Sequence, residues 1–409
     1  MKGARRAIPF VAVFSIILLF IIVYNSNIRT SSWRDLSKNV GMGEWSERLL
    51  GGENQGEEEF SPITHPKPEF RPGKTKPPGE GYSKALVVPK TKGEDISWMD
   101  EEIPDIDKFI YVADDPTAPL HPPKNKGHEV MIYLTYLIDF YDELHDVTLF
   151  MHSHQRAWHN NDILGGDAGE MIRRLSPDRV TREGYMNLKC NWGPGCPNWM
   201  HPGEPREDGN KMEEVMIAKV WAELFPLDEI PGVVAQPCCS QFALSRERIR
   251  AIPKSQYMFY RNWLLNTPLK DFVSGRVWEY LWQFVFTGES SVCPLEHVCY
   301  CDGYGVCFGG PEQFDAWYKV RGKRDDCNNK LLEWEKLGKA IEKAIDEGRV
   351  AEAAELERPE EGKDAEFKEQ IETLQAEMDM RTQVALKRGE NPRNRAIEAG
   401  RPWKEGDGF

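Results

Sequence analysis

The chain has 409 residues, of which 40% are hydrophobic and 29% are charged, a globular balance that excludes collagen, multi-span transporters and fully disordered chains. The length predicts two or three domains. The net charge of −14 argues against a nucleic-acid partner, because phosphate contacts need a basic face.

A short basic segment and an apolar run open the chain. Residues 1–7 carry three basic side chains, and 8–24 is close to the lower limit of about 17 residues for a membrane-spanning helix. A cleaved signal peptide needs small residues after its apolar core, whereas 25–28 reads Asn-Ser-Asn-Ile. The pattern therefore predicts a cytosolic 1–7 and an uncleaved, single-pass type II signal anchor at 8–24.

The predicted orientation of this anchor is inferred mainly from the cysteines. Three basic residues follow the apolar run and nearly balance those before it, so the positive-inside rule decides little. Nine cysteines, an odd set, suit an oxidising lumen with one thiol left over. We therefore expect the globular part to lie in the lumen of the secretory pathway, in the endoplasmic reticulum or Golgi.

Beyond the anchor, residues 25–84 are rich in glycine, proline and charge, which predicts a disordered stem. Strands and helices then alternate over 85–310. Strands are predicted at 85–88, 109–112, 147–151, 232–235 and 241–244, and helices at 96–103, 130–141, 211–225, 246–251, 257–265 and 276–287. This alternation predicts an α/β fold with a mixed, mostly parallel sheet flanked by helices.

The end of the chain changes in composition. A loop rich in cysteine and glycine, 293–310, closes the predicted domain. Residues 311–409 are dominated by glutamate, lysine, alanine and arginine, and helical spacing of apolar residues runs for too few turns to indicate a coiled coil. A solvated helical tail is the favoured interpretation, and a partner-binding helix is the alternative.

Two aspartates end the second predicted strand. Asp114 and Asp115 follow 109–112, and paired carboxylates there could hold a divalent cation against a diphosphate. Pro116 follows them directly, so a turn is the slightly stronger interpretation.

Three histidines follow the strand predicted at 147–151. His152 and His154 would share a face, because strand side chains repeat every second residue, and His159 could turn back toward them. They lie at the carboxyl end of the strand, where open α/β sheets bind ligands. Imidazoles in this arrangement indicate a divalent metal site, to which Asp162 could add a carboxylate. Histidines that are only hydrogen-bonded within a loop are the alternative.

Two predicted helix starts could bind an anion. Arg246 begins a helix directly after Ser245, and a guanidinium beside a helix N-terminus is a good anion site. Ser245 acting only as an N-cap is the commoner case. His128 and Glu129 open the helix at 130–141, where they could contact a phosphate or simply cap the turn.

Glu279 stands inside a predicted helix, 276–287, that is apolar nearly all round and is therefore expected to be buried. A buried carboxylate must be paired, or its pKa rises. Arg276 lies one turn earlier and could form that pair. The alternative is a general base that deprotonates an acceptor hydroxyl.

The cysteines fit disulfides better than zinc, because those within 293–310 lack paired C-x-x-C spacing. Cys190 and Cys196 flank a short loop that a disulfide could close. The adjacent Cys238 and Cys239 are expected to bond to different partners. Spacing alone leaves the full connectivity open.

Several segments occur in an order that points to one family. They are 127–129, 147–154, 157–160, 184–188, 194–197, 238–246, 274–280 and 299–302. On these segments the chain, from about Leu86 to Gly309, resembles a fungal family catalogued as domain of unknown function 3431, which has no established reaction. It is also broadly similar to nucleotide-sugar transferases of the two-half α/β type, so a glycosyltransferase-A-like fold is expected. That class ends a central strand in Asp-x-Asp, where this chain has His152, Ser153 and His154.

The resemblance and the residues together predict a membrane-anchored glycosyltransferase-like enzyme that moves a sugar from a nucleotide-sugar donor to a glycan or protein acceptor. Mn²⁺ or Mg²⁺ at the histidines or at Asp114 and Asp115 would neutralise the leaving diphosphate. Glu279 and His154 are the predicted catalytic residues. The predicted substrate contacts are Arg246, Arg276, Trp158, Asn160, Gln241, Ser245, His128 and Glu129. The alternatives are a Zn²⁺-dependent hydrolase using the same histidines and a non-catalytic, disulfide-stapled lumenal module.

Overall fold

The computed structural model describes residues 68–206, 208–209 and 211–409. The predicted anchor at 8–24 and most of the predicted stem lie outside these ranges. Within them, no helix is both long enough and apolar enough to cross a membrane.

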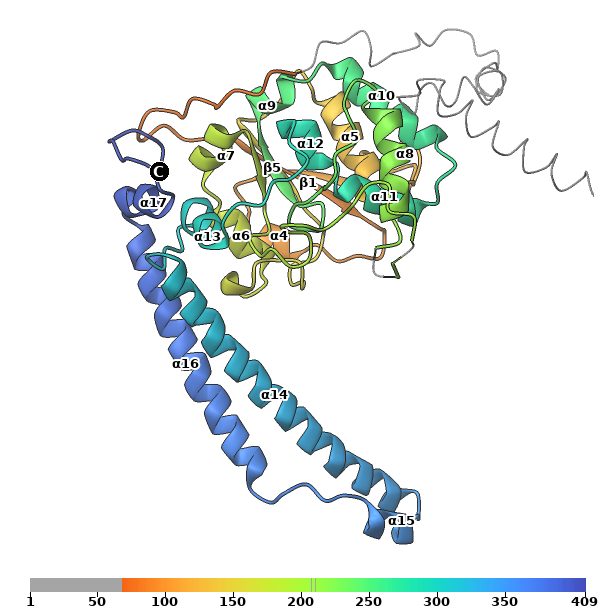
Figure 1. Ribbon diagram of the computed structural model, residues 1–409, viewed down its shortest axis with the longest axis vertical. Helices are drawn as coiled ribbons and strands as arrows, with labels where there is room; N and C mark the ends of the chain where they lie inside the picture. The colour runs from red at the N-terminus through yellow and green to blue at the C-terminus, as the bar shows by residue number, and fades with distance from the viewer. Residues whose placement is uncertain (1–67, 207, 210) are drawn as a thin grey trace, which may run out of the picture. The chain divides into compact units, whose positions relative to one another are not determined.

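A five-stranded sheet forms the centre of the fold (Figure 1). Its order is β2-β1-β3-β5-β4, with β2 at Asp107–Val112, β1 at Lys84–Lys90, β3 at Val147–Phe150, β5 at Phe242–Ser245 and β4 at Tyr185–Asn187. β1 pairs in parallel with β2 and β3, and β5 pairs antiparallel with both β3 and β4. Only β5 is therefore reversed, which confirms a mixed, mostly parallel α/β sheet.

Helices cover both faces of this sheet, and alternate strand residues enter different cores. Val87 packs into one core, whereas its neighbours Leu86 and Val88 pack into the other. Residues of α5 (Glu129–Asp139), α8 (Glu214–Leu224), α10 (Lys254–Asn266), α11 (Asp271–Glu279) and α12 (Trp282–Thr287) line the first core. Residues of α4 (Trp98–Glu102), α6 (Ala168–Arg174), α7 (Pro177–Glu183) and α13 (Glu296–Tyr304) line the second. The short α9 spans Arg246–Arg250.

Three predicted elements differ from the structure. The helix expected at 276–287 is two helices, because α11 ends at Glu279 and α12 begins at Trp282. The strand expected at 232–235 forms only isolated bridges, through Val234 and Ala235. The loop expected at 293–310 contains α13, and Cys299, Tyr300 and Tyr304 of this helix pack into the second core.

The predicted boundary between stem and domain at residue 84 is also wrong. Gly73 donates its amide to the Arg182 carbonyl at 3.0 Å, and Lys76 forms an ion pair with Asp146 at 2.9 Å. The Tyr82 hydroxyl donates to Asp178 at 2.7 Å. The last part of the predicted stem is therefore fastened to the α/β domain, since backbone and side chains both bond to it.

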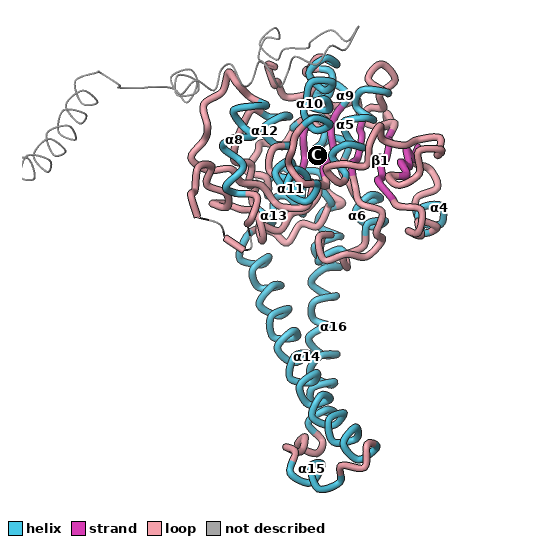
Figure 2. The backbone as a smooth tube through the Cα atoms, turned by 90° about the vertical axis from the view of Figure 1, so that its right-hand side faces the viewer, coloured by secondary structure: helices cyan, strands magenta, loops and turns pink. Residues whose placement is uncertain are grey.

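The C-terminal region is a helical hairpin rather than a solvated tail over its whole length. Its helices are α14 (Pro311–Asp346), α15 (Val350–Glu355), α16 (Lys363–Gly389) and α17 (Pro392–Glu398). α14 and α16 lie side by side in both views (Figures 1 and 2). Trp317 of α14 and Met378 of α16 are buried in the same core as Tyr300 of α13. The base of the hairpin thus belongs to the domain, and the predicted boundary at 310 is wrong.

Four disulfides hold the domain, which confirms disulfides over zinc. They join Cys190 to Cys299, Cys196 to Cys293, Cys301 to Cys307 and Cys238 to Cys239, and Cys327 is free. Two detailed expectations are wrong. Cys190 and Cys196 bond to distant partners rather than to each other, and the adjacent Cys238 and Cys239 bond to each other.

Candidate functional site

The candidate site lies where the chain leaves β3 and enters β5. The two strands are antiparallel, and Phe150 pairs with Phe242, so the residues after β3 meet those before β5 at one edge of the sheet. β1 and β2 end at the same edge, because both run parallel to β3. This is the edge at which open α/β sheets bind ligands.

His152, just beyond β3, is held by two residues that precede β5. Its backbone amide donates to the Gln241 side chain at 3.1 Å, and its Nε2 donates to the Cys239 carbonyl at 2.9 Å. Because a carbonyl oxygen only accepts, the neutral ring carries its proton on Nε2. Gln241 in turn donates to Asn160 at 3.1 Å. Asn160 and Gln241 are both buried, so they position His152 instead of forming an exposed substrate contact.

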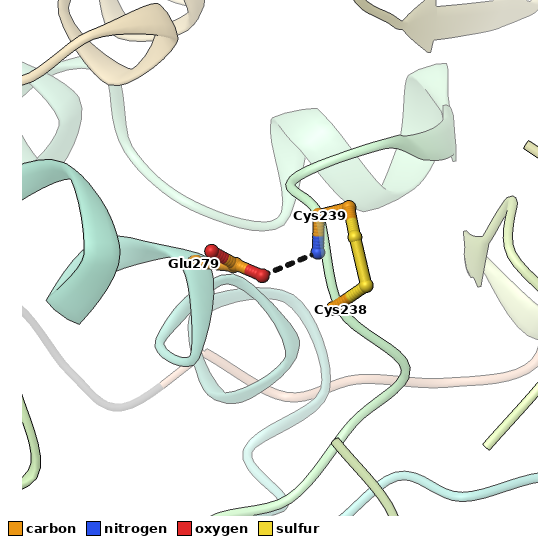
Figure 3. Close-up of side chains that lie close together, drawn as sticks. All are labelled: Cys238, Cys239 and Glu279. Carbon is orange, nitrogen blue, oxygen red and sulfur yellow. Dashed lines mark hydrogen bonds between the residues drawn. A yellow bond between two sulfur atoms is a disulfide. The ribbon is translucent and has the colours of Figure 1, made fainter. Parts of the chain in front are cut away.

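Glu279, the last residue of α11, reaches the same turn from the other side. The Cys239 amide donates to Glu279 Oε1 at 2.5 Å, next to the Cys238–Cys239 disulfide (Figure 3). Cys239 and Ser240 have φ values of 90° and 48°, a left-handed backbone that few side chains adopt without strain. This turn directs the amide of Cys239 at the carboxylate and its carbonyl at His152.

Burial raises the pKa of Glu279 to about 7, against the opposing effect of the Cys239 hydrogen bond. The nearby charge of Glu129 raises this pKa further, and that of Arg276 lowers it. Arg276 instead donates two hydrogen bonds to Glu213, at 2.8 and 2.9 Å. The expected Arg276–Glu279 ion pair is therefore not formed, and Arg276 affects Glu279 only by the electrostatic effect of its charge. Glu279 therefore exchanges its proton near neutral pH.

Lys189, two residues beyond β4, was not predicted as a site residue. Its side chain is only 4% exposed. Its ammonium lies 3.4 Å from Cys238 Sγ and 4.7 Å from the centre of the Trp158 ring. Burial lowers the pKa of Lys189 to about 8, and the charge of Glu279 partly offsets this. Trp158 itself is 73% exposed, so the cation lies beside an aromatic ring open to solvent.

The three histidines do not form one cluster. The rings of His152 and His159 lie 4.8 Å apart, and His159 Nε2 is buried without a hydrogen-bond partner. His154 is exposed and lies 3.6 Å from Glu94. Asp162 instead forms an ion pair with Arg321 of α14. Among the described residues, the groups with three potential ligands close together are Cys238, Cys239 and Glu279, and Cys301, Cys307 and Glu398, whose sulfurs are in disulfides.

His159 is expected to stay neutral across physiological pH. Burial, with smaller effects from His152 and Lys189, lowers the pKa of His159 to about 3. In the unfolded chain the pKa of His159 is about 6.5. As pH falls below that value, His159 is protonated in the unfolded state but not in the folded state. The free energy of unfolding therefore decreases as pH falls from about 6.5 toward 3. We expect His159→Gln to lose less thermal stability than the wild type between pH 7 and pH 5.

The matched control for this prediction is His121→Gln, which replaces an exposed histidine. It should keep the wild-type loss of stability on acidification. Equal losses in all three proteins would show that His159 titrates normally.

The other predicted ligands have structural partners. Asp114 accepts the Lys92 amide at 2.8 Å, and Asp115 accepts the Thr117 amide at 3.0 Å and its hydroxyl at 2.6 Å. An aspartate that bonds the backbone two residues on is the mark of an Asx turn. The structure therefore favours the turn for this pair over the cation site.

Arg246 and Ser245 lie at the opposite edge of the sheet, which corrects their assignment to the same substrate site. Ser245 pairs with Val147, the first residue of β3, and its hydroxyl accepts the Arg248 amide as the N-cap of α9. Arg246 forms an ion pair with Asp146 at 2.9 Å. Because β5 runs antiparallel to β3, the end of β5 is remote from the end of β3.

His128 and Glu129 do lie near the candidate site. His128 has a φ of 54°, and a Cβ at Gly275 of α11 would lie 2.5 Å from its ring. The absence of a side chain at Gly275 thus allows the start of α5 to approach α11. Glu129 begins α5 and acts electrostatically on Glu279, so it contributes negative charge to the site.

Comparison with known proteins adds a family. Residues 86–302 match the model of a family described as "Protein of unknown function (DUF3431)". No curated protein and no solved structure matches the chain.

Proposed function

Since the chain belongs to the DUF3431 family of proteins of unknown function, we propose its function from the site itself: a glycosyltransferase-like enzyme. It transfers a sugar from a nucleotide-sugar donor to a hydroxyl group of a glycan or protein acceptor. We further propose that 8–24 anchors it in the membrane and that the α/β domain faces the lumen of the endoplasmic reticulum or Golgi. The four disulfides support an oxidising compartment.

One observation carries the proposal. Glu279 from α11 and His152 from the end of β3 meet at opposite sides of Cys239, through hydrogen bonds of 2.5 and 2.9 Å. A partly buried carboxylate is thereby fixed at the ligand-binding edge of the sheet. In the proposed reaction the acceptor oxygen attacks the anomeric carbon, its proton passes to Glu279, and the diphosphate leaves with the bonding electrons. A base with a pKa near 7 suits this proton transfer at neutral pH.

The strand order supports a glycosyltransferase-A-like layout. β1, β2 and β3 form a parallel half, and β5 is reversed between β3 and β4. In the proposal the parallel half carries the donor, and the second half, with α11, carries the acceptor. Trp158 is exposed beside the edge and offers a flat face to a sugar or base.

The proposed metal, if it serves the donor, would be held by His152 and His159. His159 stays neutral, and its buried Nε2 lacks a partner, so the pair can supply two imidazole nitrogens. Imidazoles suit Mn²⁺ and Zn²⁺ better than Mg²⁺, which prefers oxygen ligands. A bound divalent ion would polarise the leaving diphosphate.

The unpartnered Nε2 of His159 also favours a second candidate function. Zn²⁺ on His152 and His159 would activate a water molecule, which gives a metal-dependent hydrolase. Glu279 would then take a proton from water instead of from an acceptor hydroxyl.

A thermal-shift screen of the full-length chain separates these candidates. We would add nucleotide sugars, and separately Mn²⁺, Mg²⁺ and Zn²⁺, alone and combined. A ligand at about 100 times its dissociation constant stabilises the folded state by roughly 2.7 kcal/mol. The transferase predicts stabilisation by a nucleotide sugar that weakens in Trp158→Ala and persists in the control Trp403→Ala, another exposed tryptophan. Stabilisation by Zn²⁺ alone would favour the hydrolase, and no shift with any ligand would contradict both.

A further inference from the structure

Lys189 is a buried cation without a carboxylate partner. It is 4% exposed, and none of the described acidic side chains forms a salt bridge with it. Glu279 acts on it only through space. A buried ammonium that lacks an ion-pair partner is costly to the folded state, and an anion bound beside it would reduce that cost.

Two neighbouring groups contact the ammonium of Lys189. The face of the Trp158 ring attracts a cation at 4.7 Å, and Cys238 Sγ is a weak acceptor at 3.4 Å. An ammonium has three N–H donors, so the sulfur leaves donor capacity unused. The backbone of Lys189 is fixed as well, because its amide donates to Asn187 Oδ1 at 2.9 Å and Cys190 is bonded to Cys299.

We infer that Lys189 is the cation of an anion site and that it binds the diphosphate of a nucleoside diphosphate or of its sugar ester. Two observations support this ligand class. Lys189 follows β4, which ends at the same edge of the sheet as β3, and an exposed aromatic ring lies beside its ammonium. The inference rests on the proposed function and adds to it the group that binds the leaving diphosphate.

Lys189 also bears on the metal. The ammonium is a positive charge that the chain itself supplies, so it can bind the diphosphate through N–H···O bonds whether or not a metal is present. Diphosphate binding should accordingly persist in a chelator.

The test is calorimetric titration of the full-length chain in EDTA with inorganic pyrophosphate, nucleoside diphosphates, free nucleosides and a free uronate. We expect the two diphosphate-bearing ligands to bind. Lys189→Met should weaken that binding by at least about tenfold, as loss of a charge-assisted hydrogen bond does, and Lys189→Arg should retain it within about threefold. The control is Lys84→Met, which removes a half-buried lysine at the opposite edge of the sheet.

Several results would overturn the inference. They are wild-type affinity in Lys189→Met, binding that disappears in EDTA and returns with Mn²⁺, and tighter binding of the uronate than of pyrophosphate. Pyrophosphate binding that depends on Lys189, with no sugar transfer from any donor, would keep the anion site and reject the transferase. Sugar transfer that is unchanged in Lys189→Met would keep the transferase and reject the anion site.

A second measurement needs no variant. Binding of pyrophosphate to the wild-type chain in EDTA should weaken as the salt concentration rises, because it depends on a charge-assisted contact. Absence of pyrophosphate binding to the folded wild-type chain would contradict the site even if Lys189→Met failed to fold.

Discussion

Glu279→Gln is expected to lower kcat for sugar transfer by about 10²–10⁴-fold while changing KM little, because the amide cannot accept the acceptor's proton. The variant keeps the size of the side chain and an oxygen for the Cys239 amide. Since the pKa of Glu279 is about 7 and the base must be ionised, the wild-type rate should fall about tenfold per unit as pH drops below 7. This acid limb should be absent in the variant. Steady-state rates from pH 5 to 9 measure both effects.

The unfolding temperature of Glu279→Gln shows whether its low rate comes from lost catalysis or from lost folding. The pKa of Glu279 is higher in the folded state than in the unfolded state, so ionisation above pH 7 destabilises the fold and protonation in acid relieves it. Glu279→Gln should therefore unfold at the same temperature as the wild type or higher at pH 8. Glu143→Gln, which alters an exposed glutamate, is the control and should retain wild-type rates. Wild-type kcat in Glu279→Gln would rule out its role as the base.

Removing the Cys190–Cys299 and Cys196–Cys293 disulfides together is expected to lower the free energy of unfolding by at least about 4 to 5 kcal/mol. Cys196–Cys293 lies inside the loop that Cys190–Cys299 closes, so a loop of roughly 100 residues, worth about 4.7 kcal/mol, opens only when both bonds are absent. All four cysteines are replaced by alanine, which avoids unpaired thiols. Denaturant unfolding of the full-length chain gives the change.

The Cys301–Cys307 disulfide is the internal control. Its cysteines are only 6 residues apart, so Cys301→Ala/Cys307→Ala should cost less than about 3 kcal/mol by the same reasoning. Similar losses in this variant and in the variant that lacks both long-range disulfides would show that loop closure does not govern these disulfides. No loss from removing the two long-range disulfides would show that the unfolded chain is already compact between residues 190 and 299.

Much of the sheet was predictable because its strands are short apolar runs between turn residues. β1, β2, β3 and β5 fall close to their predicted ranges, whereas β4 has three residues and too little pattern to recognise. The break between α11 and α12 carries no glycine or proline, so the apolar pattern continues across Tyr280 and Leu281. That break makes Glu279 the end of a helix, where its carboxylate can meet Cys239.

The site was predictable where it depends on local pattern. His152 follows a strand and Glu279 interrupts an apolar helix, and both signals are visible in the chain. Lys189 could not be found this way, because its burial depends on Trp158 and on Cys238, which is 49 residues away. The Cys238–Cys239 disulfide was not predicted for a related reason, because the spacing of cysteines does not reveal how the backbone turns between them. A lysine directly beside a cysteine was the one available signal.

The most direct test is a transfer assay with the full-length wild-type chain, a panel of nucleotide sugars and glycan acceptors, in which mass spectrometry detects both products. We predict that at least one donor gives an acceptor heavier by one sugar, together with an equal amount of nucleoside diphosphate, and that Glu279→Gln gives neither at a comparable rate. A folded wild-type chain that binds a nucleotide sugar yet transfers the sugar to no acceptor and releases no diphosphate would contradict the transferase.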